Sequence, residues 1–129
     1  MANIPEKLRY SKDHEWLSVD GDTATIGITD YAQHSLGDVV YVELPKPGDK
    51  FDSHEAFGSV ESVKAVSEVF TPVAGEIIES NDALNDEAEK VNSDPYGDAW
   101  MIKIKMNNAG DADAMLTAAE YEEYLSNIE

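Results

Sequence analysis

The chain has 129 residues, 42% of them hydrophobic, which is enough to bury one core and too little for two comfortable ones. Nine basic and 27 acidic residues give a net charge of −18, which repels nucleic acid and anionic membranes, so we expect neither as a partner. The absence of cysteine excludes disulfides, thiol nucleophiles and thiolate metal sites. We therefore predict a single domain over residues 1–129.

The beginning of the chain shows no targeting signal. It reads Met-Ala-Asn-Ile-Pro-Glu-Lys-Leu, which has neither a hydrophobic signal core nor an Arg-rich amphipathic presequence. No apolar run in the sequence approaches the length of a membrane span. These features leave the cytosol and the mitochondrial matrix as candidate locations.

The first third of the chain predicts a hairpin, a helix and a further strand. Alternating runs at 14–19 and 24–28 flank Asp20 and Gly21, which favours a tight turn, and Trp16 is expected in a core or interface. Residues 29–37 read as a short crossover helix, with Thr29 or Asp30 as N-cap, Gln33 completing a capping box and Gly37 as the stop. A strand is predicted over 38–44.

The stretch from residue 57 to residue 78 places Lys64 between two runs that both read as strands. The density of β-branched residues there favours strand over helix, so Lys64 is expected near the tip of a hairpin spanning about 57–75, exposed and reachable. Gly75 follows Pro72 closely, which suggests a turn that needs a positive φ. A lone lysine on a turn is most often a solvated charge, and neighbouring motifs are needed to say more.

The C-terminal half predicts a polar loop, one strand and a terminal helix. Residues 79–98 are mostly loop, with one possible helical turn at 86–91. Residues 99–105 form a half-buried strand with Trp100, Ile102 and Ile104 on one side. A helical segment covers about 111–128, in which Thr117 and Glu120 make a capping box and the apolar face packs on the sheets.

Independent catalytic machinery is not indicated. His14, His34 and His54 lack the short spacing of a metal pair, so we expect no metal site. There is no Gly-rich phosphate loop and no Gly-x-Ser-x-Gly elbow, and adjacent carboxylates such as Glu122 and Glu123 do not face each other across a cleft. We expect a protein without catalytic activity of its own.

Several motifs together resemble those of one family of carrier proteins. Residues 61–65 read Glu-Ser-Val-Lys-Ala with Gly75 downstream, and further matches lie at 10–16, 27–33, 36–40 and 92–100. These motifs are similar to those of glycine cleavage system H proteins, and the similarity extends over nearly the whole chain. The resemblance implies a mainly β fold, a lipoyl-type flattened barrel or sandwich of two antiparallel sheets (a barrel-sandwich hybrid) with a short crossover helix and a C-terminal helix.

The resemblance also implies a cofactor and partners. Lys64 would carry lipoic acid as N6-lipoyllysine, and the protein would shuttle an aminomethyl group and reducing equivalents. Its partners would be a pyridoxal-phosphate glycine decarboxylase, a tetrahydrofolate-dependent aminomethyltransferase, a flavin dihydrolipoyl dehydrogenase and lipoylating enzymes. A monomer in the bacterial cytoplasm is expected, and a mitochondrial location would require a presequence that has been removed.

Four other residues are candidates for roles around Lys64. Glu61 is either read by the lipoylating enzymes, which is the interpretation we favour, or only keeps the hairpin soluble. Glu15 and Glu68 are candidate contacts for the ammonium of a loaded arm resting in a surface groove. His14 and Glu15 are either polar residues beside that groove or solvated strand positions, and the sequence favours neither reading.

Two alternative functions remain open, and a third is disfavoured. A biotin carrier is disfavoured because Val63 and Ala65, rather than methionines, flank the lysine. The N-terminal His-Glu-Trp segment and the Asn-Ser-Asp-Pro-Tyr loop argue against a stand-alone lipoyl domain of a 2-oxo-acid dehydrogenase. An H-like protein that relays lipoyl groups to other carriers would need the same lysine, so the sequence does not separate it from glycine cleavage.

Overall fold

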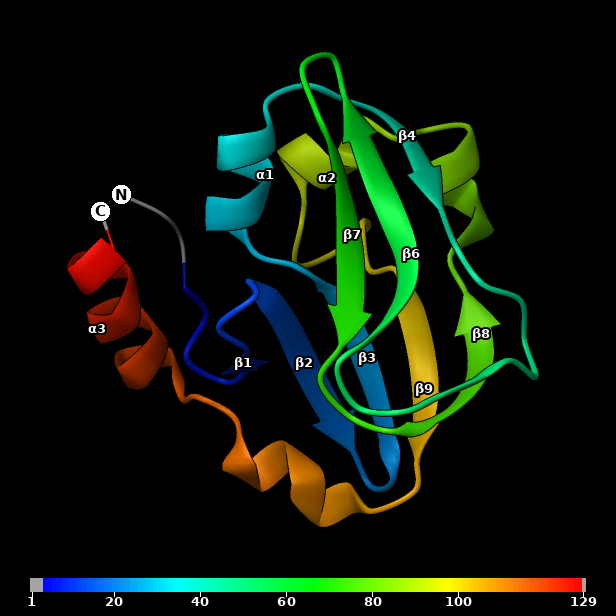
Figure 1. Ribbon diagram of the computed structural model, residues 1–129, viewed down its shortest axis with the longest axis vertical. Helices are drawn as coiled ribbons and strands as arrows, with labels where there is room; N and C mark the ends of the chain where they lie inside the picture. Colours follow the sequence, from blue (N-terminus) through cyan, green and yellow to red (C-terminus); the bar gives the residue numbers. More distant parts are fainter. Residues whose placement is uncertain (1–3, 129) are drawn as a thin grey trace.

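The computed structural model describes residues 4–128, so the outermost ends of the predicted 1–129 domain lie outside the described residues. Two antiparallel sheets lie against each other, and short helices cover their margins (Figure 1). The two sheets stay separate, so the predicted mainly β fold is confirmed as a sandwich and not a closed barrel. No described helix is long and apolar enough to cross a membrane.

The larger sheet has six strands and the smaller sheet has three. In spatial order, the larger sheet contains β1 (Arg9–Tyr10), β2 (Glu15–Asp20), β3 (Thr23–Ile28), β9 (Ile102–Met106), β8 (Gly75–Ser80) and β5 (Lys50–Phe51). The smaller sheet contains β4 (Val39–Glu43), β6 (Glu55–Ser62) and β7 (Val66–Thr71). The helical elements are α1 (Asp30–Leu36), α2 (Lys90–Ser93), α3 (Ala118–Ile128) and the 3₁₀ helices η1 (Asp82–Asn85) and η2 (Ala109–Ala114).

The N-terminal hairpin and the crossover helix are both present. Strands β2 and β3 pair from Asp20 opposite Thr23, so the turn is Gly21-Asp22, one residue later than predicted, and Gly21 has a φ of +64°. Helix α1 then carries the chain from the larger sheet to the smaller one. Its N-cap is Thr29, whose side chain accepts from the Ala32 N–H.

The predicted capping box at the start of α1 is wrong. Gln33 donates from Nε2 to Asp30 Oδ1 at 2.7 Å, a contact between two side chains on the first turns of the helix. It therefore does not reach back to the N-cap backbone, as a capping box would require. The predicted stop is confirmed, because Gly37 has a φ of +83° and its N–H bonds to the Gln33 carbonyl.

The prediction that Gly75 needs a positive φ is also wrong. Positive φ among the described glycines occurs at Gly21, Gly37 and Gly48 only. Gly75 instead opens strand β8 between Phe51 and Met106, and a Cβ there would overlap the backbone carbonyl oxygen of Lys105. Glycine is needed at this position because the neighbouring strand approaches too closely for a side chain.

Two further boundaries differ from the prediction. The loop at 79–98 contains η1 and α2, so the predicted helical turn at 86–91 overlaps the observed helix only at Lys90 and Val91. Strand β9 begins at Ile102, so Trp100 lies before the strand. Lys103 Nζ lies 5.0 Å from the centre of the Trp100 ring. Trp100 packs against an aromatic cluster outside the main core and not in line with Ile102 and Ile104.

The main core lies between the two sheets, and a second cluster joins the C-terminal helix to them. The main core includes Leu17, Ile26, Val60, Ile77, Ile102 and Ile104, all at most 1% exposed. The second cluster consists of Tyr10, Trp16, Tyr121 and Leu125, which confirms the interior position predicted for Trp16. Helix α3 begins with the predicted capping box, in which the Thr117 N–H bonds to Glu120 and the Glu120 N–H bonds to the Thr117 hydroxyl.

Candidate functional site

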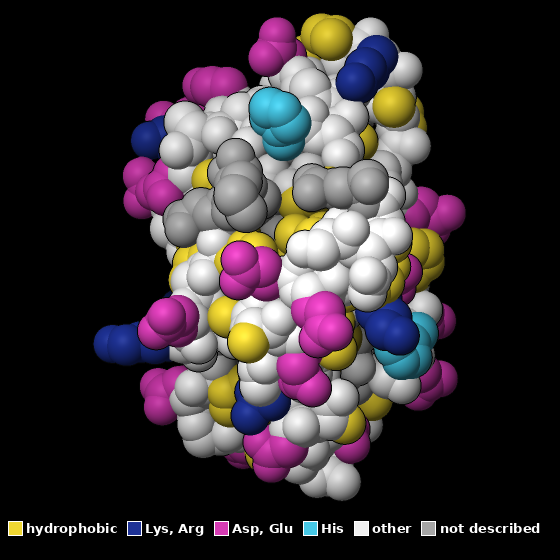
Figure 2. Space-filling view, turned by 90° about the vertical axis from the view of Figure 1, so that its left-hand side faces the viewer, with side chains coloured by type: hydrophobic (Ala, Val, Ile, Leu, Met, Phe, Trp, Pro, Cys, Tyr) yellow, Lys and Arg dark blue, Asp and Glu magenta, His cyan; other side chains and the backbone are white. Residues whose placement is uncertain are grey.

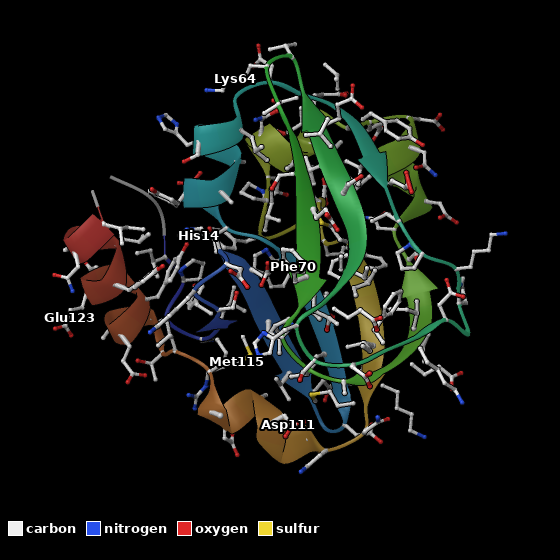
Figure 3. The ribbon with its side chains drawn as sticks, viewed as in Figure 1. His14, Lys64, Phe70, Asp111, Met115 and Glu123 are labelled. Atoms are coloured by element: carbon white, nitrogen blue, oxygen red, sulfur yellow. The ribbon has the colours of Figure 1, made fainter. Side chains whose placement is uncertain are left out.

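Lys64 lies in the three-residue tip of the hairpin formed by β6 and β7, at one end of the molecule (Figure 3). The Ser62 N–H closes the tip by bonding to the Ala65 carbonyl at 2.8 Å. The Ser62 hydroxyl oxygen accepts from the backbone N–H groups of Lys64 at 3.3 Å and Ala65 at 3.1 Å. Ser62 thus fixes the backbone at the lysine and leaves the lysine side chain exposed, as predicted.

The hairpin tip rests on the loop that follows helix α1. The Val63 N–H donates to the Asp38 carbonyl at 3.1 Å. A Cβ on Gly37 would lie 3.4 Å from Lys64 Cε, so the lysine side chain passes directly beside that glycine. The loop at Gly37 and Asp38 therefore sets the direction in which Lys64 leaves the protein.

Asn92, in helix α2, holds that loop in place. Its Nδ2 donates to Gln33 Oε1 at 2.9 Å and to the Gly37 carbonyl at 2.8 Å, and its Oδ1 accepts from the Val39 N–H at 2.8 Å. A single amide side chain thus ties together helix α1, the loop after it and the first residue of β4. The position of the lysine hairpin depends on a residue that comes after it in the chain.

The surface around the tip is apolar as well as acidic. Val63 and Val66 are 72% and 66% exposed, and Tyr41 on the neighbouring strand β4 is 49% exposed. Glu61 lies on β6 between Tyr41 and Val66 in the strand register, and it is exposed. The carboxylate of Glu61 is accessible to a protein that handles Lys64, and its recognition role stays a prediction.

A pocket of about 180 Å³ brings together His14, Glu15 and Glu68. The pocket is enclosed by helix α1, by the loop before β2 together with the first residue of β2, by the end of β3, and by strands β6 and β7. The lining combines carboxylates, two serine hydroxyls and aliphatic or aromatic side chains: Asp13, His14, Glu15, Ile28, Tyr31, Ala32, Ser35, Leu36, Val60, Ser67, Glu68 and Val69. Three side chains chosen from the sequence thus converge from segments up to 54 residues apart.

Glu15 is buried, so the reading of it as a solvated strand position is wrong. It is 2% exposed, and one carboxylate oxygen accepts from the Ser11 hydroxyl while the other lies 3.4 Å from the Phe70 N–H. Burial raises its pKa from 4.5 to about 7, although the hydrogen bond from Ser11 opposes this rise. Near neutral pH the carboxyl therefore exists in both protonation states.

His14 is not a solvated strand position either. It precedes β2, has a φ of +70°, and its Nδ1 lies 2.8 Å from the Tyr121 hydroxyl. Its ring also packs against Tyr31 with ring centres 4.6 Å apart. Burial lowers the pKa of the imidazole, while the nearby Asp13 carboxylate acts in the opposite direction. The neutral ring is thus the favoured form.

The buried carboxyl of Glu15 gives a testable dependence of stability on pH. A pKa of about 7 in the folded protein against 4.5 in the unfolded chain means that the folded state binds more protons between these values. The contribution of Glu15 to stability is therefore full below about pH 4.5 and falls as the pH rises to about 7. We expect Glu15→Gln to unfold like the parent at pH 4.5 and to be more stable at pH 8 by on the order of 2–3 kcal/mol.

Urea unfolding at both pH values measures this difference. Glu68→Gln is the matched control, because Glu68 lines the same pocket but is exposed, and it should give no comparable gain at pH 8. An equal stability of Glu15→Gln and the parent at pH 8 would contradict the raised pKa.

Among residues 4–128, no three or more His, Asp or Glu side chains are grouped so as to hold a metal ion. The described residues do provide a reachable amine at the hairpin tip and a pocket, lined in part by the two strands of the same hairpin, that carries carboxylates and apolar side chains. An amine of this kind suits covalent attachment of a flexible cofactor, and a pocket of this kind suits a cationic group on an apolar stem.

Comparisons with known proteins agree with this arrangement. The family model described as glycine cleavage H-protein matches residues 8–128. The chain belongs to the glycine cleavage H-protein family. It is 53% identical over 122 residues to the glycine cleavage system H protein of Staphylococcus carnosus, covering 95% of this chain and 97% of that protein. The H protein of Geobacillus kaustophilus is 54% identical over 120 residues, covering 93% of this chain and 94% of its own.

The fold is also that of an H protein of known structure. The crystal structure of a glycine cleavage system H protein from Mycobacterium marinum matches with a TM-score of 0.85 and 34% sequence identity. The match covers 97% of this chain and 98% of that one. The H-protein resemblance drawn from the motifs is thus confirmed for both sequence and fold.

Three residues important to the site did not stand out in the sequence. Asn92 lies in the H-protein motif at 92–100, and this motif marks the residue in the sequence. The motif does not reveal the hydrogen bonds that the Asn92 side chain makes. Ser11 and Tyr31 also lie in H-protein motifs, and only the structure shows that they contact Glu15 and His14. Motif membership therefore located these residues without giving their roles.

Proposed function

We propose that this chain is the lipoyl-bearing carrier of the glycine cleavage system, with lipoic acid attached to Lys64 as N6-lipoyllysine. The observation that carries the proposal is an exposed lysine on a hairpin tip held by Ser62, on a hairpin whose strands also line a carboxylate-bearing pocket, in a chain of the H-protein family. Forming the amide joins Lys64 Nζ to the lipoyl carboxyl carbon, with loss of two protons from the ammonium and of the leaving group from the activated acyl donor.

The residues of this chain supply position and the cofactor supplies reactivity. When bound, the lipoyl group offers a dithiolane that can take up an aminomethyl group and reducing equivalents. We assign no catalytic step to the protein side chains. The lysine side chain plus an attached lipoyl chain would extend on the order of 15 Å, which suffices to enter the active site of a partner while the sandwich stays outside. Tethering provides the effective concentration.

The partners follow from this role. We propose that Lys64 is served by a pyridoxal-phosphate glycine decarboxylase, a tetrahydrofolate-dependent aminomethyltransferase, a flavin dihydrolipoyl dehydrogenase and the lipoylating enzymes, and that Glu61 assists recognition by the latter. The apolar side chains of Val63 and Val66 would pack at each docking site. We also propose that the carrier is a monomer, and that it acts in the bacterial cytoplasm, which the bacterial origin of its relatives supports.

The net charge of the chain suits brief encounters with several enzymes. Acidic side chains are scattered over the face shown in Figure 2 and outnumber the basic ones there. With a net charge of −18, the protein would be steered towards basic surfaces of its partners, which mainly raises association rates and is weakened by salt.

We further propose that the pocket shelters a loaded arm between visits. Glu15 and Glu68 would face the ammonium of the bound group, while Ile28, Val60 and Val69 would exclude water from its stem. We expect the double variant Glu15→Gln, Glu68→Gln to release ammonia and formaldehyde from the loaded carrier about tenfold faster, because two charge-assisted contacts are lost.

The release experiment has a built-in control. Glu61→Gln removes a carboxylate of the same hairpin that does not line the pocket, and it should leave the release rate unchanged. If the double variant releases its cargo at the parent rate, the pocket contacts are not those of the loaded arm.

Two measurements test the proposed function itself. A mass spectrum before and after treatment with a lipoate ligase shows whether Lys64 accepts the group. Glycine–bicarbonate exchange with purified glycine decarboxylase shows whether the lipoylated protein supports glycine cleavage. A protein that is lipoylated at Lys64 but supports no exchange would instead be a relay of lipoyl groups to other carriers.

A further inference from the structure

We propose that Tyr121, in the C-terminal helix α3, is a positioning residue for the pocket: it holds the His14 imidazole in one orientation and one tautomer. The effect on a loaded arm rests on the proposed function, whereas the effect on His14 does not. Tyr121 does not itself line the pocket, so its action passes through His14, which does.

The Tyr121 hydroxyl bridges two elements that shape the pocket. Its oxygen lies 2.8 Å from His14 Nδ1 and 2.8 Å from Thr29 Oγ1. Thr29 is the N-cap of α1, the helix that contributes Tyr31, Ala32 and Leu36 to the lining. One phenol therefore couples the start of α1 to the ring of His14.

The direction of these hydrogen bonds follows from counting donors. Thr29 Oγ1 accepts from the Ala32 N–H at 3.2 Å, and its own hydrogen can then be donated to the Tyr121 oxygen. Tyr121 in turn donates to His14 Nδ1. The reverse direction would give the Thr29 hydrogen no acceptor among the hydrogen bonds found within residues 4–128, which is unfavourable for a fully buried hydroxyl.

This direction sets the tautomer of His14. An imidazole nitrogen that accepts a hydrogen bond carries no hydrogen, so Nδ1 is bare and the neutral ring holds its hydrogen on Nε2. The ring thus has a donor at the edge away from Tyr121. The pocket lining therefore includes a defined donor in addition to the acceptors of Glu15 and Glu68.

The phenol is itself rigidly held. Tyr121 is fully buried, and its ring stacks on that of Tyr10 with centres 4.7 Å apart and planes within 3°. Leu125, one turn further along α3, belongs to the same buried cluster. Because packing and not the hydroxyl fixes this ring, Tyr121→Phe should retain the stack and remove only the two hydrogen bonds.

Tyr121→Phe tests the proposal, with Tyr124→Phe as the matched control. Tyr124 lies on the same helix, its ring is near His14, and its hydroxyl bonds to the exposed Lys12 carbonyl at 3.3 Å. The first readout is the pair of ring ¹⁵N shifts of His14 in the unmodified proteins, at a pH where the imidazole is neutral. We expect the Nε2–H form in the parent and in Tyr124→Phe, and a mixture of tautomers in Tyr121→Phe.

The second readout is the release of ammonia and formaldehyde from the loaded carrier. We expect Tyr121→Phe to release about threefold more slowly than the parent, because the fraction of His14 with a bare Nε2 can accept one hydrogen bond from the ammonium, and Tyr124→Phe to match the parent. Lipoylation of Lys64 should proceed equally in all three proteins, because the hairpin tip makes no contact with α3 among the described hydrogen bonds.

Each outcome decides the proposal. An Nδ1–H tautomer in the parent overturns it, and this result needs no variant to fold. An unchanged tautomer or an unchanged release rate in Tyr121→Phe overturns it as well. Should the parent fail to accept lipoate, the proposed function falls, while the ¹⁵N comparison still decides the role of Tyr121.

Discussion

Lys64→Arg is expected to abolish lipoyl attachment and to reduce glycine–bicarbonate exchange to background. A guanidinium stays protonated at any physiological pH and offers no amine for amide formation, although it keeps the charge and most of the length of lysine. Lys64 is exposed at the hairpin tip, and the contacts that fix the tip are made by backbone groups and the Ser62 side chain. The variant should therefore fold as the parent does.

Lys50→Arg provides the matched control for this loss. Lys50 is an exposed lysine on strand β5, in the sheet that does not contain the hairpin. After treatment with the ligase, Lys50→Arg should gain the mass of one lipoyl group and support exchange, whereas Lys64→Arg should gain no mass. A lipoyl group found on Lys64→Arg would place the attachment at another lysine and remove the basis of the proposed function.

Local features of the fold could be predicted because their causes are local. The hairpin of β2 and β3 follows from alternating side chains around Gly21, and the tip at Lys64 follows from two runs that read as strands and are separated by three residues. The caps at Thr29 and at Thr117 depend on residues three positions away. In each case the interacting groups lie within one short stretch of sequence.

The pocket could be foreseen only in part, because its properties depend on segments that are distant in sequence. Glu15 and Glu68 could be named as candidates from the H-protein resemblance. Burial raises the pKa of Glu15, whereas the hydrogen bond from the Phe70 backbone, 55 residues away, opposes this rise, and neither effect can be seen in the residues around position 15. The contact of His14 with Tyr121 spans 107 residues, and the pattern of α3 shows its apolar face but not the partner of a hydroxyl.

Gly75 shows how a local reading goes wrong when the cause is a neighbouring strand. Its position shortly after Pro72 suggested a turn, yet its φ is not positive. The constraint comes from β9, which passes so close that a Cβ on residue 75 would overlap the Lys105 carbonyl oxygen and lie 3.0 Å from Ile104 Cγ1. No spacing within residues 72–78 reports on that strand, which is paired about 30 residues later in the chain.

Gly75→Ala is accordingly expected to destabilise the protein by about 3 kcal/mol or more. Relief of the overlap would require β8 and β9 to separate where their backbones pair.

Gly21→Ala is the control. Gly21 has a φ of +64°, and a Cβ at this position would have no neighbour within 4 Å. The change should therefore cost only about 1 kcal/mol, which comes from the backbone conformation. Urea midpoints of both variants measure the difference. If Gly75→Ala were as stable as Gly21→Ala, close approach of the strands would not be the reason for glycine at position 75. Strands β8 and β9 would then have to move apart at a lower cost than is usual in a close-packed interior.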